Sequence, residues 1–171
     1  YNKKKINIEN YSLNEVWKNK NLKEKDQQNL NSFFWLFSLD LRSSKKDTQN
    51  VIYQWINTND RYNSKNWKID IIGKRIIAWI SNSRLTYEDG RIDYKDKFNR
   101  IIKKQINHLI NEIKSSELIN DKIIGCAAII LTGISYPQNN NYLNTGLSLL
   151  KKLIKYSLDN DGFPKSRNIR Q

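Results

Sequence analysis

The only histidine in the 171-residue sequence is His108, whose imidazole could act as a general base or as a hydrogen-bond donor near neutral pH. His108 stands beside the apolar Leu109, so a boundary histidine satisfied by a neighbouring helix is the structural alternative. The sequence has one histidine and one cysteine, Cys126, and their spacing is not that of a metal-binding motif. A metal site within this sequence is therefore not expected.

A second group of polar residues lies near the end of the sequence. Lys165, Arg167 and Asn168 would offer donors suited to a carboxylate or a sulfate. They follow Asp161 and Gly162, a pair that is also typical of a glycine turn after a helix C-terminus. The segment is therefore either an anion-binding end or a simple turn.

The tryptophans and tyrosines form a third group, because aromatic faces can stack on sugar rings. Trp35, Trp55 and Trp79 lie on or beside apolar stripes, where packing in the core is the default. Trp67 and Tyr62 flank a polar segment and are the better candidates for exposure. These two residues are the predicted aromatic contacts for a ligand.

The elements that position these residues are predicted to be helices. Apolar residues recur every three to four positions rather than every two, and the signal for β-strands is poor throughout. We predict an all-α chain of antiparallel helical hairpins, with loops at 57–64 and 81–91. The expected helices cover residues 26–42, 47–57, 67–80, 93–114, 121–135 and 141–158, after a shorter helix that opens at Ser12.

The order of residues in the 67–80 helix resembles the helical domain of the heparinase II/III family of polysaccharide lyases. That family has a tryptophan, a short polar gap, Leu-Arg-Ile and a second tryptophan, and the matching residues here are Trp67, Arg75, Ile76 and Trp79. The resemblance implies that residues 1–171 form one helical domain, an incomplete α/α toroid. It also implies a longer protein, whose C-terminal β-sandwich would follow Gln171.

The resemblance further implies that the full-length protein cleaves an acidic, uronate-containing polysaccharide by β-elimination. Asn120 matches the asparagine that holds the uronate carboxylate in the family, which would favour an enolate-like intermediate. Asp121 departs from the family's histidine, and an anion there would oppose an acidic substrate. Asn120 and Asp121 also suit a helix N-cap.

The resemblance therefore implies Asn120 and His108 as catalytic residues. A tyrosine and a histidine beyond residue 171 would complete the site, so the segment alone should not be catalytic, and it needs no cofactor. Arg75 is expected to face the cleft or to pin a loop, while Trp79 packs in the core. The expected substrate-binding residues are Arg75, Lys165, Arg167, Asn168, Trp67 and Tyr62.

The net charge of +13 suggests a polyanionic partner, here an acidic polysaccharide, although a codon bias towards lysine would give much the same number. Lys103 and Lys104 are expected on outer helix faces. Nucleic acid is a weaker alternative, because no recognisable binding motif is present. No apolar stretch has the length of a membrane span. A family member of typical kind would be periplasmic or secreted.

A non-catalytic relative, which binds carbohydrate or belongs to the cell envelope, is the alternative to a lyase. The aspartate at position 121 favours this alternative.

Overall fold

Every regular element in the computed structural model is helical within the described residues, which are 17, 22–40 and 42–157. No strand forms in these ranges, so the prediction of an all-α chain is confirmed there. The elements are α2 (Glu24–Ser32), η2 (Phe34–Ser38), α3 (Lys45–Asn59), α4 (Ile69–Ser81), α5 (Ser83–Thr86), α6 (Ile92–Glu112), α7 (Ile119–Ser135), η3 (Pro137–Asn139) and α8 (Asn140–Ser157).

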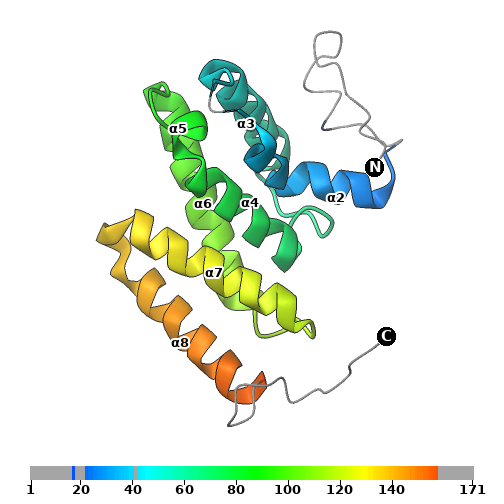
Figure 1. Cartoon of the computed structure of the whole chain (residues 1–171), viewed down its shortest axis with the longest axis vertical. Coiled ribbons are helices and arrows are strands. Elements are labelled where there is room, and N and C mark those ends of the chain that lie inside the picture. The colour runs from blue at the N-terminus through cyan, green and yellow to red at the C-terminus, as the bar shows by residue number, and fades with distance from the viewer. Residues whose placement is uncertain (1–16, 18–21, 41, 158–171) are drawn as a thin grey trace.

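The helices α2, α4, α7 and α8 follow one another as direct neighbours across the molecule (Figure 1). The helices α4 and α7 run in the same direction, and α8 returns antiparallel to α7 (Figure 1). Helix α6 packs against α3, α4 and α7, and in Figure 1 it lies behind α4. The starts of α4 and α7 therefore lie at the same end of the molecule.

Glycines allow the helices α7 and α8 to approach closely. A Cβ atom on Gly133 would lie 2.7 Å from the Cα of Leu143, and a Cβ on Gly146 would lie 3.0 Å from the backbone nitrogen of Ile130. Backbone atoms cannot move aside as the end of a flexible side chain can. The α7–α8 hairpin therefore depends on small residues at both positions.

The core is centred on the apolar stripes of α4 and α6, as their helical spacing predicts. Ile72, Ile76 and Trp79 of α4 are fully buried, and Trp79 packs against Phe98 of α6 with ring centroids 5.2 Å apart. Trp55 of α3 meets Trp79 edge to face at 5.5 Å. Trp55 and Trp79 are thus core residues, as predicted.

The prediction of one continuous helix over 26–42 is wrong. The chain leaves the helical conformation at Phe33, whose φ of 55° is left-handed, and continues as the 3₁₀ helix η2. The Phe33 ring is fully buried and contacts Trp55 and Trp79, with centroids 5.8 and 5.1 Å away. Burial of a phenylalanine side chain contributes about 1.5–3 kcal/mol, which offsets the roughly 1–2 kcal/mol cost of the left-handed residue.

This break also changes which aromatic residues are exposed. Phe34 and Phe37, which the continuous helix would place on its buried side, are 50% and 49% exposed. The expected loop over 81–91 differs too, because it contains the short helix α5. Thr86 at the end of α5 donates a hydrogen bond to the carbonyl of Trp79 at 2.6 Å. The start of the expected helix at Ser12 lies outside the described residues.

Candidate functional site

Three residues that the sequence analysis selected separately meet at the loop between α3 and α4. The ring centroids of Tyr62 and Trp67 each lie 5.4 Å from that of His108, and the Tyr62 and Trp67 rings are 6.1 Å apart. Tyr62 and Trp67 come from the loop, whereas His108 comes from the last turns of α6. We call these three residues the Tyr62 platform.

His108 is tied to the loop by a hydrogen bond. Its Nε2 donates to the backbone carbonyl of Trp67 at 3.2 Å, because a carbonyl oxygen can only accept. In a neutral imidazole this bond leaves Nδ1 as the acceptor nitrogen. His108 is therefore a half-buried boundary residue, but its partner belongs to the loop before α4 and not to a neighbouring helix as the structural alternative had it. One of its two ring nitrogens is already occupied.

Within the Tyr62 platform the tyrosine ring is exposed and the tryptophan ring is buried. Tyr62 is 64% exposed, as predicted, but Trp67 is only 4% exposed, so the prediction that Trp67 is exposed is wrong. Trp67 is covered because His108 and Tyr62 pack around it. Its indole nitrogen has no hydrogen-bond partner among the described residues, so one donor in the platform remains unused.

Two cationic residues stand close to Tyr62 in the sequence, and a third comes from α6. Arg61 and Lys65 of the loop are exposed, and neither forms an ion pair within the described ranges. Lys104 of α6 lies over the Trp67 ring, with Nζ 5.7 Å from the centroid. Its ammonium also hydrogen-bonds the carbonyl of Asp60 and pairs with that carboxylate at 3.4 Å. Lys104 is thus part of the Tyr62 platform's surroundings rather than an isolated cation on an outer face.

Sequence reasoning did not select these cations. The signal that could have found Arg61 and Lys65 was local, because both stand within three residues of the aromatic Tyr62 in a polar segment. No local signal links Lys104 to this loop.

Arg75 lies inside the molecule rather than at a cleft. It is fully buried, and burial lowers the pKa of its guanidinium to about 9, so it remains charged at neutral pH. Nε donates to Gln105 Oε1 at 3.0 Å, and the two terminal nitrogens donate to the carbonyls of Asn31 at 2.8 Å and Asn66 at 3.0 Å. Arg75 thus pins the loop before α4, and its burial does not fit the expected contact with substrate.

Asn120 and Asp121 lie in the first turn of α7, which begins at Ile119. The N-cap is Leu118, so neither residue is the cap that the alternative interpretation predicted. Asn120 is exposed. Burial, followed by the charge of Asp70, raises the pKa of the Asp121 carboxyl. The site at this helix start therefore disfavours negative charge.

The remaining predicted ligand contacts cannot be placed. Lys165, Arg167 and Asn168 lie outside the described residues. Their contact with a carboxylate or a sulfate stays a prediction. Within the described ranges, no group of three or more histidine, cysteine, aspartate or glutamate side chains is arranged to hold a metal ion. In the same ranges, no helix has the combined length and apolarity needed to cross a membrane.

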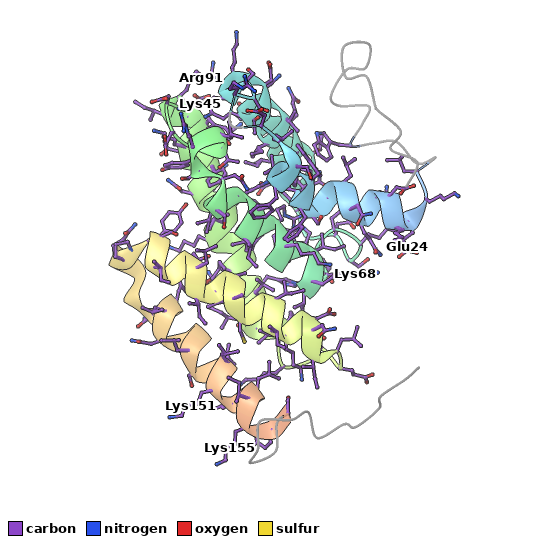
Figure 2. The ribbon with its side chains drawn as sticks, in the orientation of Figure 1. Glu24, Lys45, Lys68, Arg91, Lys151 and Lys155 are labelled. Carbon is purple, nitrogen blue, oxygen red and sulfur yellow. The ribbon has the colours of Figure 1, made fainter. Side chains whose placement is uncertain are left out.

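The surface charge of the described residues is dispersed. Lys45 and Arg91 lie at one end of the molecule, Lys68 lies beside Glu24 of α2, and Lys151 and Lys155 lie along α8 (Figure 2). Lys68 and Glu24 form an ion pair at 3.4 Å.

Comparison with known proteins found no similarity that assigns this chain. No family model matches it, and no curated protein and no solved structure matches it significantly.

Proposed function

We propose that this chain is the helical domain of a heparinase II/III-like protein and binds acidic, uronate-containing polysaccharide. The proposed domain is an incomplete α/α toroid, and the proposed full-length protein includes a C-terminal β-sandwich and cleaves its substrate by β-elimination. The observation that carries the binding half of the proposal is the Tyr62 platform, in which an exposed tyrosine ring packs against Trp67 and His108 and the exposed Arg61 and Lys65 stand nearby in the same loop.

The chemistry of this platform suits an acidic sugar. A pyranose has an apolar face that can stack on the Tyr62 ring, and the ring is held in place by Trp67 and His108. Arg61 and Lys65 can then donate hydrogen bonds to a carboxylate or a sulfate, and charge-assisted hydrogen bonds are roughly twice as strong as neutral ones. The Nδ1 of His108 offers one acceptor for a sugar hydroxyl, whereas the unpartnered indole N–H of Trp67 is buried and does not face a ligand.

The second candidate function is binding without catalysis, and Asp121 favours it. In the lyases that the sequence resembles, this position holds a histidine, whereas here a carboxylate lies close enough to Asp70 for the two charges to disfavour each other. A uronate placed next to Asn120 would meet this negative charge. A non-catalytic carbohydrate-binding or cell-envelope relative accommodates the aspartate without loss of its function.

The binding proposal is tested by titrating the 171-residue chain with polygalacturonate, heparin and a neutral glucan. We expect both acidic polymers to bind and the glucan to bind at least about tenfold more weakly. The affinity for the acidic polymers should fall between 50 and 300 mM salt, because screening acts over about 8–10 Å near physiological ionic strength.

Tyr62→Ala removes the exposed ring, and Tyr156→Ala is the matched control, since Tyr156 is 77% exposed on α8. We expect only Tyr62→Ala to weaken binding, by about tenfold, because stacking on an aromatic ring contributes on the order of 1–3 kcal/mol where bases stack. Equal affinity in both variants would contradict the platform. Tighter binding of single-stranded nucleic acid than of either acidic polysaccharide would favour the nucleic-acid alternative.

Catalysis is tested separately, in the full-length protein. β-Elimination leaves a conjugated double bond that absorbs in the ultraviolet, so its appearance measures the reaction directly. We expect Asn120→Ala to abolish this signal with little change in polymer binding. Binding without any ultraviolet signal would favour the non-catalytic relative.

A further inference from the structure

A hollow with a volume of about 310 Å³ lies between α6, the end of α7 and the start of α8. Its volume is at the small end of the range for ligand pockets, and it suits one ring-sized molecule rather than a polypeptide segment. Its lining residues come from helices whose mutual packing is described above. They belong to α6, the end of α7, η3 and the start of α8.

The hollow has an apolar floor and a positively charged rim. Ile102 and Thr132 are buried at its base, whereas Arg100 and Lys103 are exposed. No carboxylate is among the lining residues, and neither cation forms an ion pair within the described part of the chain. Two unpaired cations beside apolar surface favour an anion that also carries an apolar face.

The tyrosines of the hollow are fixed by hydrogen bonds. The Tyr136 hydroxyl donates to Asn99 Oδ1 at 3.0 Å, and the Asn99 amide donates to the Tyr87 hydroxyl at 2.9 Å. The Tyr142 hydroxyl donates to Asn107 Oδ1 at 3.2 Å. Because each phenol uses its single proton on a protein acceptor, each offers a ligand only its ring and the lone pairs of its oxygen. Arg100, Lys103 and Gln138 are the lining side chains with donors that make no hydrogen bond at all within the described residues.

The hollow is separate from the Tyr62 platform, although both adjoin α6. Lys104 faces the loop before α4, where it lies over Trp67, whereas Lys103 lines the hollow. Successive residues of an α-helix differ in direction by about 100°, so the two lysines serve different flanks of α6. A ligand bound at the Tyr62 platform therefore leaves the hollow empty, and a ligand bound in the hollow leaves the platform empty.

We propose that this hollow binds one acidic sugar unit, a pyranose that carries a carboxylate or a sulfate. The choice of a sugar rests on the proposed function, whereas the requirement for an anion rests on the rim alone. The pyranose lies against the rings of Tyr136 and Tyr142, and its anionic group meets Arg100 and Lys103. The Gln138 amide is placed to bind a ring hydroxyl.

The test uses monosaccharides, which can fill the hollow but cannot span both sites. The 171-residue chain is titrated with methyl glucuronide, glucose 6-sulfate, methyl glucoside and benzoate, and binding is followed by NMR at the Gln138 amide and the Tyr142 ring. We expect at least one acidic sugar to bind and methyl glucoside to bind at least about tenfold more weakly. Methyl glucuronide tests a carboxylate as the anionic group, and glucose 6-sulfate tests a sulfate. Binding of either sugar supports the proposal.

Arg100→Gln combined with Lys103→Gln removes both charges from exposed positions. Its matched control is Lys46→Gln with Arg84→Gln, which removes one exposed lysine and one exposed arginine elsewhere. We expect the first pair of substitutions to lower the affinity for the acidic sugar by about tenfold or more. That change corresponds to the loss of one to two charge-assisted hydrogen bonds. The control pair should change the affinity by less than about twofold.

Three results would overturn the proposal: no binding of either acidic sugar, equal losses in both double variants, or tighter binding of benzoate than of the acidic sugars. None of them decides the function proposed for the Tyr62 platform. That function fails only if the long acidic polymers do not bind, or bind equally to Tyr62→Ala and its control.

Discussion

The guanidinium carbon of Arg75 lies 4.1 Å from the ring centroid of Trp55, and both side chains are fully buried. Both residues also donate hydrogen bonds to Asn31. The Trp55 indole donates to the Asn31 side-chain oxygen at 2.8 Å, and Arg75 donates to the Asn31 backbone carbonyl. One positive charge thus joins α2, α3, α4 and α6, and no carboxylate of the described residues pairs with it. The aromatic face and three neutral oxygens take the place of a counter-ion.

Arg75→Ala should destabilise the fold by on the order of 3–5 kcal/mol. The change leaves the acceptors on Asn31, Asn66 and Gln105 without a donor and opens a cavity beside Trp55. Urea unfolding of the variant measures this loss. Arg84→Ala, on the exposed surface, serves as the control and should stay within about 0.5 kcal/mol of the parent. A loss of similar size in both variants would contradict a special role for Arg75.

Gly133→Ala should separate α7 from α8. Alanine favours a helix over glycine by about 1 kcal/mol, so helix propensity alone predicts a gain in stability. The new Cβ would meet the backbone of Leu143, however, and overpacking costs about 1–3 kcal/mol. We expect a net loss in the free energy of unfolding. Ser148→Ala on the exposed face of α8 should be nearly neutral, and a more stable Gly133→Ala would rule out the close contact.

Asp121→Asn should stabilise the chain at neutral pH by roughly a few tenths of a kcal/mol. The pKa of Asp121 is raised above its ordinary value of 3.8, so its ionised form is disfavoured in the folded state and stability falls as the pH rises above that value. The gain from asparagine should therefore shrink as the pH falls toward 3.8. Urea midpoints of both proteins from pH 4 to pH 7 measure it. A less stable variant at pH 7 would mean that the helix dipole, which favours an anion in the first turn, is the larger effect.

Tyr136→Phe should make stability less dependent on pH in alkali. Burial raises the pKa of Tyr136 to about 12 from an ordinary value of 10.0. Between these values the unfolded chain has lost the phenol proton that the folded chain keeps, so wild-type stability falls as the pH rises. The variant loses the hydrogen bond to Asn99, which costs about 1 kcal/mol. It has no phenol proton at position 136, so its stability does not show this decrease with pH. Its deficit in the free energy of unfolding should narrow from pH 8 to pH 11, and a constant deficit would contradict the raised pKa.

The amino-acid sequence alone was enough to predict most of the helices and much of the core. Apolar spacing of three to four residues predicted helices close to α3, α4, α6, α7 and α8, because an amphipathic helix must bury one face whatever its neighbours are. The same reasoning placed Trp79 in the core and Tyr62 on the surface, as observed. Periodicity is a local property, so it can be read before the tertiary structure is known.

The break at Phe33 and the make-up of both sites depend on contacts between residues far apart in the sequence. Phe33 leaves the helix because its ring packs among tryptophans from α3 and α4, which no local pattern indicates. His108 and Trp67 are 41 positions apart, and their contact depends on how α6 packs beside the loop before α4. Likewise, Lys103 and Lys104 are neighbours in sequence but serve different sites, since a helix turns about 100° per residue and each flank meets a different partner.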